Sequence, residues 1–348
     1  MLLELLSHQN LSDMAYGHDP LFKFAVSRAI YKGIVKFVAY QNNTGYVIQP
    51  LPVDHFSMKQ TGKKTIQLSW NPVLDPIEPS AVPTKYKVYQ RINEAGFDNG
   101  TTIEGTSTEI ELSEFGTVYS FKVTALNEGG ESFPSEILST CLLDNDKPAV
   151  LVVNAFDRVA GPAMVDKGDF AGFAHWVDEG VADKVNIGYI GEQYDFNRKS
   201  KWLDDDSPGW GASYGDMEGS LIPGNSFDNA IIHGKSIMGA GYSFLSCSDE
   251  AFSAAGFELN PFETIDMIFG EEKTKRDQSG EMFKVFDKDL QAKLKEFVDK
   301  GGNVFASGAY IASDHILNED TIAQKFANEV LHFKWRTNHA VRQGTLYS

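Results

Sequence analysis

The sequence predicts a multidomain chain in which a strand-helix segment precedes a β-sandwich and a three-layer α/β domain with a mostly parallel sheet. Three observations predict this order. An amphipathic helix lies within the first 40 residues, apolar residues alternate with polar ones between about residues 55 and 140, and continuous apolar runs separated by helical patterns follow residue 148. The 348 residues are enough for two or three domains.

The first segment, residues 1–42, is predicted to form a strand and a helix. An apolar run at residues 2–6 is interrupted by Glu4, and apolar residues recur at helical spacing from Phe22 to Phe37. The order strand, acid, Asn/Asp-containing turn and amphipathic helix resembles the C-terminal edge of zinc-dependent N-acetylmuramoyl-L-alanine amidases, which cleave peptidoglycan. The resemblance covers residues 1–40 and implies that Glu4 corresponds to the catalytic glutamate of that family.

The resemblance also implies that the zinc ligands of that family, His, Glu and His, belong upstream of the matched segment. A hydrolytic zinc site needs about three protein ligands, and His8 and His18 match none of those positions. We therefore expect no metal and no cofactor in this chain, with zinc only in an upstream part. Glu4 is either a catalytic residue separated from its metal or an ordinary carboxylate at a strand end.

Composition restricts the partners and the compartment. A net charge of -17 and a pI near 4.9 exclude nucleic acid and anionic membranes as expected partners, because phosphate surfaces would repel the chain. Two cysteines, Cys141 and Cys247, provide no disulfide framework. The sequence contains no apolar run of membrane-spanning length and no secretory signal at its start. We expect that signal upstream too, and so an extracytoplasmic protein that is periplasmic, secreted or on the cell surface.

Residues 43–54 are predicted to be a linker, because they combine a turn-rich break with two prolines that favour extended backbone. The next domain, residues 55–143, is predicted to be an antiparallel β-sandwich. Its alternating segments are residues 65–70, 86–89, 109–112 and 119–127. With Trp70, Tyr119 and the Gly-rich turn after residue 127, the region of about residues 55–142 resembles a fibronectin type III domain. The resemblance implies a core position for Trp70 and a corner hydrogen bond to upstream backbone for Tyr119.

Such sandwiches either bind partners through loops or space other domains. The loops at residues 76–80 and 94–98 contain neither an aromatic cluster nor a basic patch, which are the anchors that interfaces favour. A spacer role is therefore expected.

The remaining residues, 144–348, are predicted to form the α/β domain. Apolar runs that lack alternation indicate strands covered by helices on both faces. These runs are residues 149–153, 185–190, 264–269 and 302–306. The clearest helix begins at Asp287 and ends at Gly301.

Residues 298–310 resemble the class I glutamine amidotransferase-like, flavodoxin-like superfamily, and the looser resemblance covers about residues 148–335. Active members carry a cysteine at the strand-to-helix turn, where this chain has Ser307, so amidotransferase chemistry is not expected. Ser307 is either a nucleophile that requires a histidine base or a small residue that lets a helix pack closely. The histidines available as a base are His175, His233, His315, His332 and His339.

Ligands of open α/β sheets bind at the carboxyl ends of the strands. The polar residues expected there are Asn154, Asp157, Glu192, Glu271, Glu272, Ser307 and Tyr310. Together they could bind a cation or sugar hydroxyls, or the acids could simply cap helix N-termini.

A long irregular insert is expected at residues 196–228. It contains Trp202, Trp210 and Tyr214, which could stack on sugar rings or cover an edge of the sheet. The run Asp204-Asp205-Asp206 lacks the glycine and distal glutamate of a calcium loop, so no cation site is expected there.

These observations leave three hypotheses. The first is the C-terminal part of a secreted, cell-wall amidase-like protein whose α/β module is not catalytic and binds a cell-wall glycan, another polysaccharide or a surface protein. The second is a polysaccharide-acting hydrolase or lyase, since bacterial proteins of this modular build are sometimes labelled xanthan lyases. The third is a structural scaffold.

Overall fold

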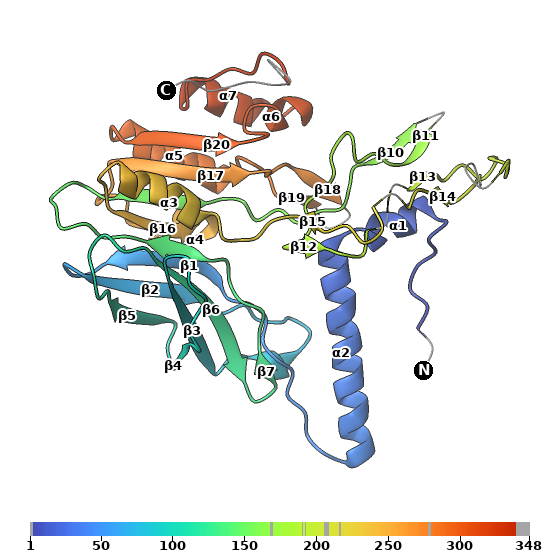
Figure 1. Cartoon of the computed structure of the whole chain (residues 1–348), viewed down its shortest axis with the longest axis horizontal. Coiled ribbons are helices and arrows are strands. Elements are labelled where there is room, and N and C mark those ends of the chain that lie inside the picture. Colours follow the sequence, from blue (N-terminus) through green and yellow to red (C-terminus); the bar gives the residue numbers. More distant parts are fainter. Residues whose placement is uncertain are drawn as a thin grey trace. The chain divides into compact units, whose positions relative to one another are not determined.

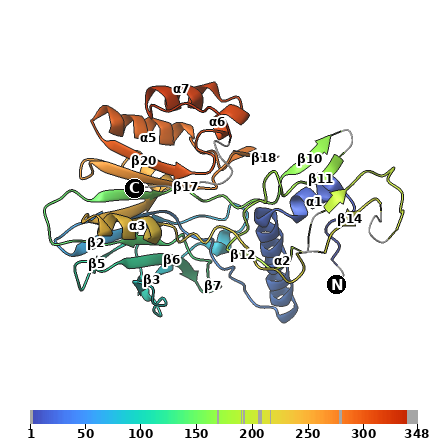
Figure 2. The same cartoon turned by 45° about the horizontal axis from the view of Figure 1, so that its top comes forward.

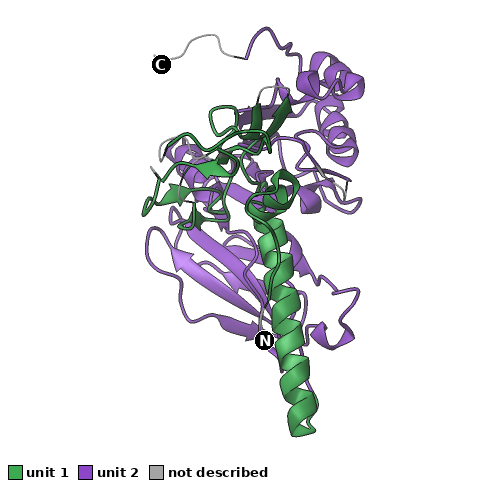
Figure 3. Ribbon diagram, turned by 90° about the vertical axis from the view of Figure 1, so that its right-hand side faces the viewer, with its two compact units in different colours: residues 1–45, 158–227 green, residues 46–157, 228–348 purple. Residues whose placement is uncertain are grey.

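The computed structural model describes residues 3–167, 170–189, 191, 193–204, 209–215, 217–277 and 280–338. The chain divides into two compact units, shown in Figure 3. Unit 1 contains residues 1–45 and 158–227, and unit 2 contains residues 46–157 and 228–348. Residues 158–227 were expected in the α/β domain, but they cluster with the N-terminal segment.

Unit 1 combines two helices with short strands. The helices are α1 (Leu11–Gly17) and α2 (Pro20–Asn42). One sheet has the order β10 (Met164–Lys167), β11 (Phe170–Phe173), β13 (Gln193–Asp195) and β14 (Ala212–Ser213), and β12 (Val185–Asn186) pairs with β15 (Ile222–Pro223). No helix among the residues described meets the length and apolarity needed to cross a membrane.

The predicted N-terminal helix is present and has clear end signals. Asp19 caps the first turn of α2 by accepting a hydrogen bond from the backbone N–H of Leu21, and Asn43 ends the helix in the left-handed conformation, with φ of 55°. Its apolar side chains remain largely uncovered, since Phe37 is 58% exposed. The strand expected at residues 2–6 is wrong where the chain is described. Residues 3–6 form no strand and are exposed, and a strand without a neighbour cannot satisfy its backbone hydrogen bonds.

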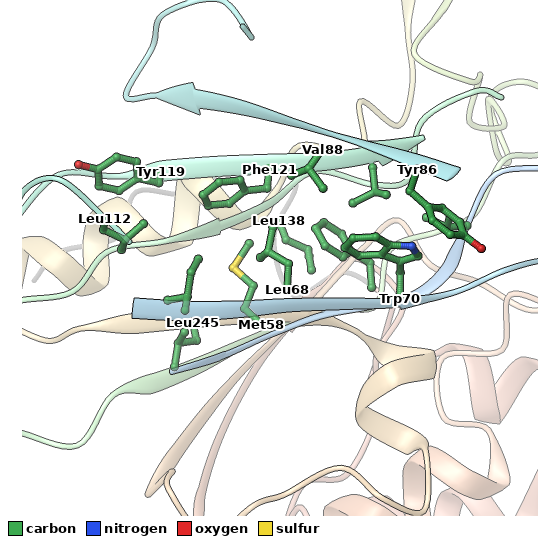
Figure 4. Close-up of a cluster of buried hydrophobic side chains, with 14 of the residues drawn as sticks. Met58, Leu68, Trp70, Tyr86, Val88, Leu112, Tyr119, Phe121, Leu138 and Leu245 are labelled. Carbon is green, nitrogen blue, oxygen red and sulfur yellow. The ribbon is translucent and has the colours of Figure 1, made fainter. Parts of the chain in front are cut away.

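Unit 2 contains the expected sandwich. One sheet includes β1 (Asp54–Gln60), β2 (Thr65–Asn71) and β5 (Ser107–Glu111). The facing sheet includes β3 (Lys85–Ile92), β4 (Thr101–Ile103), β6 (Tyr119–Asn127), β7 (Gly130–Glu131) and β8 (Leu138–Thr140), and a short 3-10 turn, η1 (Pro79–Ala81), precedes β3. Figure 4 shows inward side chains of both sheets, including Trp70 and Phe121, packed in one core. All four strands predicted here are confirmed.

Tyr119 makes the corner that the sequence predicts. Its hydroxyl accepts a hydrogen bond from the backbone N–H of Glu114 at 3.0 Å and pairs with the Ser113 hydroxyl at 2.6 Å. The side chain is buried, so the two groups have little access to water.

Tyr119→Phe is expected to lower the free energy of unfolding by about 1–2 kcal/mol, because it leaves the Glu114 N–H without its partner. Urea denaturation measures the loss. Tyr242→Phe, which changes an exposed tyrosine, is the control and should stay within about 0.5 kcal/mol of the parent. Equal losses in the two variants would contradict this role for the corner.

The rest of unit 2 is built on four parallel strands in the order β16 (Phe244–Ser248), β9 (Val150–Asn154), β17 (Thr264–Gly270) and β20 (Asn303–Gly308). Helix α3 (Ala230–Gly239) packs on the face that includes Val152 and Ile268. The opposite face, with Leu151 and Met267, packs against α4 (Asp249–Ser253), α5 (Lys288–Asp299) and α7 (Thr321–Glu329). Figures 1 and 2 show α3 and α5 on opposite sides of these strands. The hairpin β18 (Lys275–Asp277) and β19 (Gly280–Met282) and helix α6 (Asp314–Leu317) complete the unit.

Three of the four predicted parallel strands are confirmed as β9, β17 and β20. The strand expected at residues 185–190 is wrong, because among its described residues, 185–189, only β12 forms, and β12 pairs antiparallel with β15 in unit 1. The strand beside β9 is instead β16, whose serines and cysteine are buried. The helix predicted from Asp287 is confirmed as α5: the Asp287 side chain caps it, and Gly301, with φ of 88°, follows its end.

The sandwich and the parallel strands share one seven-stranded sheet, because β1 pairs antiparallel with β16. A second junction lies beside it. Backbone groups of Cys141 and Phe244 exchange hydrogen bonds of 3.1 and 2.9 Å, and the buried Ser246 hydroxyl bonds to both backbone groups of Ser139. The cores are continuous too, since Leu245 packs in the sandwich core. The two halves of unit 2 therefore form one packed body.

Candidate functional site

A pocket of about 210 Å³ lies at the carboxyl ends of β17 and β20, beside α3. Its lining residues are Phe156, Asn229, Ile232, His233, Ile268, Gly270, Ser307 and Gly308. Ser307 thus lies at the sheet edge where the sequence predicts a ligand site. The register pairs Ser307 with Ile268, so both side chains point to the face that α3 covers.

Beside Ser307, the pocket contains an oriented histidine. His233, on α3, pairs through Nδ1 with Oδ2 of Asp266 at 2.8 Å, and Asp266 is a buried residue in the middle of β17. The carboxylate fixes the imidazole so that Nε2 is the nitrogen left for other partners. No hydrogen bond between Ser307 and His233 occurs in the described part of the chain. The arrangement can bind a polar group and could supply a base to Ser307 if the two moved closer.

A second group of polar side chains lies where β9 and β16 end and β1 begins. Asn154 closes β9 beside Ser248, the last residue of β16, and Asp249 and Glu250 follow directly at the start of α4. The Ser57–Cys247 pair between β1 and β16 brings the start of β1 to the same place. We call Asp54, Glu136, Asp157, Asp249 and Glu250 the acidic edge cluster. Asn154 joins it by donating through Nδ2 to a carboxylate oxygen of Glu136.

Mutual repulsion and burial disturb the ionisation of this cluster. Burial, followed by repulsion from Glu250, raises the pKa of Glu136 and of Asp249 well above their ordinary values. The same two causes raise the pKa of Asp157 to about 7. Within the described residues, no group of three or more His, Cys, Asp or Glu side chains is placed to hold a metal ion.

Glu272 also meets the acidic edge cluster, because its buried carboxylate accepts a hydrogen bond from the backbone N–H of Asp157 at 3.2 Å. The other predicted site residues of the strand ends and of the N-terminal segment lie outside these two groups. Glu4 is exposed in a segment without secondary structure, and Glu192 lies outside the described residues. Glu271 is exposed after β17, and the Tyr310 ring lies 5.0 Å from the Lys273 ammonium group.

The aromatic residues of the insert belong to unit 1 and remain accessible. Trp202 is 63%, Trp210 38% and Tyr214 49% exposed, and the Trp210 indole N–H donates to the carbonyl of Gln9 at 3.0 Å. Most of the described part of the insert is irregular, as the sequence predicts.

Another cavity, of about 230 Å³, lies between the β18–β19 hairpin and helices α6 and α7 and is lined in part by His315. Asp314 accepts hydrogen bonds from the backbone N–H and hydroxyl of Thr274, and burial lowers the pKa of His315. The charged groups lining the cavity pair with each other, as Arg276 does with Glu281 and Lys284 with Asp320. These contacts make it a packing region for the hairpin.

Several residues of both groups do not follow from the strand-end rule. Asp266 had a usable signal, since it is the only acid in an otherwise apolar predicted strand. Asp249 and Glu250 follow a serine, a pattern that indicates a helix start, and Ser248 does cap α4. Glu136 had no local signal, because it reaches the site only through the junction between β8 and β16.

Comparison with known proteins identifies one part of the chain. A model of the fibronectin type III domain family matches residues 51–140. Residues 51–140 are a fibronectin type III domain. In it, Trp70 and Tyr119 occupy the core and the corner. The comparison supports the predicted spacer-like sandwich.

Solved structures similar to this chain include the fourth FNIII domain of a human protein, the FN5 domain of Drosophila Lar and an FN3 domain of human collagen XX. Their identities are 20%, 15% and 22%, and their TM-scores are 0.26, 0.23 and 0.22. The similarity covers 30%, 28% and 28% of this chain and 89%, 99% and 99% of those chains. No curated protein matches the chain.

Proposed function

We propose that unit 2 is a binding module in which the fibronectin type III domain rigidly supports a flavodoxin-like α/β half. The strand order β16-β9-β17-β20 supports the flavodoxin-like part, since numbering these strands along the chain gives 2-1-3-4. The proposed setting is an extracytoplasmic, cell-wall amidase-like protein. This setting rests on the resemblance of residues 1–40 to the amidase family. Within that segment, the predicted amphipathic helix, α2, is the feature that supports the proposal.

The pocket beside α3 carries the proposal. Asn229, His233 and Ser307 bring donors and acceptors, and Phe156 provides an aromatic wall. With about 210 Å³, the pocket is smaller than the roughly 300–1,000 Å³ of sites for drug-sized ligands. A single uncharged sugar unit of a glycan is the expected ligand, because its hydroxyls match the polar lining.

The test is an NMR titration of the full chain with N-acetylglucosamine and with soluble peptidoglycan fragments. Shifts should appear at residues around Ser307, and Ser307→Val should weaken binding at least tenfold, because it removes the hydroxyl from the polar lining and adds a methyl group that narrows the pocket. The control Ser107→Val changes an exposed serine of β5 and should bind as the parent does. Binding that survives Ser307→Val, or no binding at all, would refute the proposal, and no binding would favour the scaffold hypothesis.

A hydrolase is the second candidate, favoured by the His233–Asp266 pair beside Ser307. In that case Ser307 attacks the acyl carbon of an ester while His233 accepts the serine proton, and the bond to the alcohol oxygen breaks as His233 returns that proton to the leaving group. Water then hydrolyses the acyl-serine with His233 as base, and Asp266 holds the imidazole throughout. We expect slow hydrolysis of p-nitrophenyl acetate that falls at least a hundredfold in Ser307→Ala and in Asp266→Asn. Equal rates in the parent and Ser307→Ala would dismiss this candidate and leave the binding module.

A further inference from the structure

Asn154 has an unsatisfied acceptor at the acidic edge cluster. The residue is 3% exposed, and its side-chain nitrogen donates to Glu136. Its side-chain oxygen is buried and has no hydrogen-bond partner. A buried carbonyl oxygen without a donor costs about 1–3 kcal/mol. The same side chain therefore contacts the acidic edge cluster through its nitrogen and carries an acceptor that no described group satisfies.

The acids around Asn154 also lack positive partners. Among the described residues, Glu136, Asp157, Asp249 and Glu250 form no ion pair with a lysine, arginine or histidine. Asp54 has a neighbouring imidazole, since its carboxylate lies 3.2 Å from Nδ1 of His55. The cluster therefore presents acceptors from the sandwich, from the end of β9 and from α4, and little that can donate.

The chemistry of the missing group follows from these features. It must carry positive charge, and it must offer several hydrogen-bond donors to carboxylate and amide oxygens. A small metal ion requires oxygens converging at about 2.0–2.6 Å, and the described side chains do not form such a group. An ammonium group carries three donors on a tetrahedral nitrogen and accepts longer contacts of about 2.7–2.9 Å.

We propose that the acidic edge cluster, with the Asn154 side-chain oxygen, is a binding site for a primary ammonium group of a ligand. The amine of an amino sugar and the side-chain amine of a peptide share this chemistry. The site is separate from the pocket beside α3, and the inference holds whether or not that pocket binds a sugar.

The raised pKa values of Glu136 and Asp249 support this assignment. Carboxylates that repel one another bind protons in the free protein, and a ligand cation would replace those protons. Binding should therefore release protons and strengthen as the pH rises.

The test uses the full chain at pH 8 with glucosamine, N-acetylglucosamine, lysine and calcium chloride, at constant ionic strength set with KCl. Glucosamine should shift the Asn154 side-chain amide in NMR spectra. N-acetylglucosamine has no ammonium group and is the ligand expected in the pocket beside α3, so it should leave the Asn154 amide unshifted. A response to lysine alone would assign the site to a peptide amine, and a response to glucosamine alone to an amino sugar.

Glu250→Gln should weaken ammonium binding at least tenfold, and Glu109→Gln, an exposed acid in β5, is the control. Asn154→Leu is a second variant that removes the acceptor without changing the charge, and it should also weaken binding. A larger shift with calcium, an equal shift with N-acetylglucosamine, or unchanged binding in both folded variants would overturn the inference.

Discussion

Phe121→Ala is expected to lower the free energy of unfolding of unit 2 by about 3–5 kcal/mol and to release the parallel sheet together with the sandwich. Phe121 is fully buried in β6, between the two sheets of the sandwich. Removing its ring leaves a cavity that neighbours such as Leu68 and Leu138 cannot fill without moving.

The loss of stability should extend to the parallel strands because one sheet continues across the boundary between the sandwich and these strands. β1 pairs with β16, and Ser139 of β8 bonds through its backbone to the Ser246 hydroxyl in the same strand. On the α3 face, Val118 and Cys141 of the sandwich pack with Phe244 and Ile231. Unfolding the sandwich alone would expose this core and these buried hydroxyls, so a single transition is favoured.

Two probes measure the result. Fluorescence of Trp70, in a parent whose other four tryptophans are replaced by Phe, is to be compared with hydrogen exchange at the amides of β9 and β17 during urea titration. Both should report one midpoint, which shifts equally in Phe121→Ala. Phe133→Ala, an exposed position in the same domain, is the control and should shift neither probe. Retention of amide protection in β9 after the tryptophan signal is lost would show two independent modules and contradict the expectation.

The sandwich was the most predictable part of unit 2. Its strands alternate with period two because one face is buried and the other is solvated, and this alternation is visible without knowledge of the partner strand. The edge strands β4 and β7 are too short to show a pattern, which is why they were missed. The pairing of β1 with β16, across the boundary between the sandwich and the parallel strands, cannot be predicted from the sequence. A single residue pair such as Ser57 with Cys247 has no local sequence signal.

The parallel sheet was predictable only where its strands are strongly apolar. β9 and β17 were found, but β16, with the sequence Phe-Leu-Ser-Cys-Ser, looks too polar for a covered strand. Its Ser246 is tolerated because its hydroxyl bonds to Ser139, which lies a hundred residues away in the sandwich. A strand that contains a buried serine can be predicted only when the hydrogen-bond partner of that serine is known.

The candidate site residues could likewise be predicted from the sequence only in part. Its members at strand ends, Asn154, Asp157 and Ser307, follow from topology and were predicted. Glu136 and His233 come from a loop of the sandwich and from a helix, and only tertiary packing brings them to the strand ends. The strand prediction for the N-terminal residues was wrong for a different reason. The apolar run around Glu4 resembles a strand, but a strand requires a paired neighbour that the described chain does not provide.

Raising the pH from 5 to 8 is expected to destabilise unit 2 through the acidic edge cluster. The folded protein holds protons on Glu136, Asp157 and Asp249 at pH values where the unfolded chain has released them. The native state therefore binds more protons than the unfolded state, and stability falls as the pH rises. For Asp157 the fall begins near its ordinary pKa of 3.8 and is complete only above its folded value of about 7.

The expected loss is about 1–3 kcal/mol over this pH range. One unit of pKa shift corresponds to about 1.4 kcal/mol. The total is reduced because Asp157 also presents surface to solvent, which screens the repulsion, although its carboxyl group packs among the other acids. Glu250→Gln should reduce the dependence and raise stability at pH 8, since repulsion from Glu250 is, after burial, the next largest cause of all three shifts.

Urea denaturation at several pH values, in buffers of equal ionic strength and without amines, measures the slope. Glu109→Gln removes one negative charge from the exposed surface of the sandwich and should retain the slope of the parent, so it separates the local effect from net charge. A parent whose stability rises steadily from pH 5 to 8 would be inconsistent with carboxylates that are protonated in the folded state. If Glu250→Gln kept the full slope, the protons would have to reside elsewhere in unit 2.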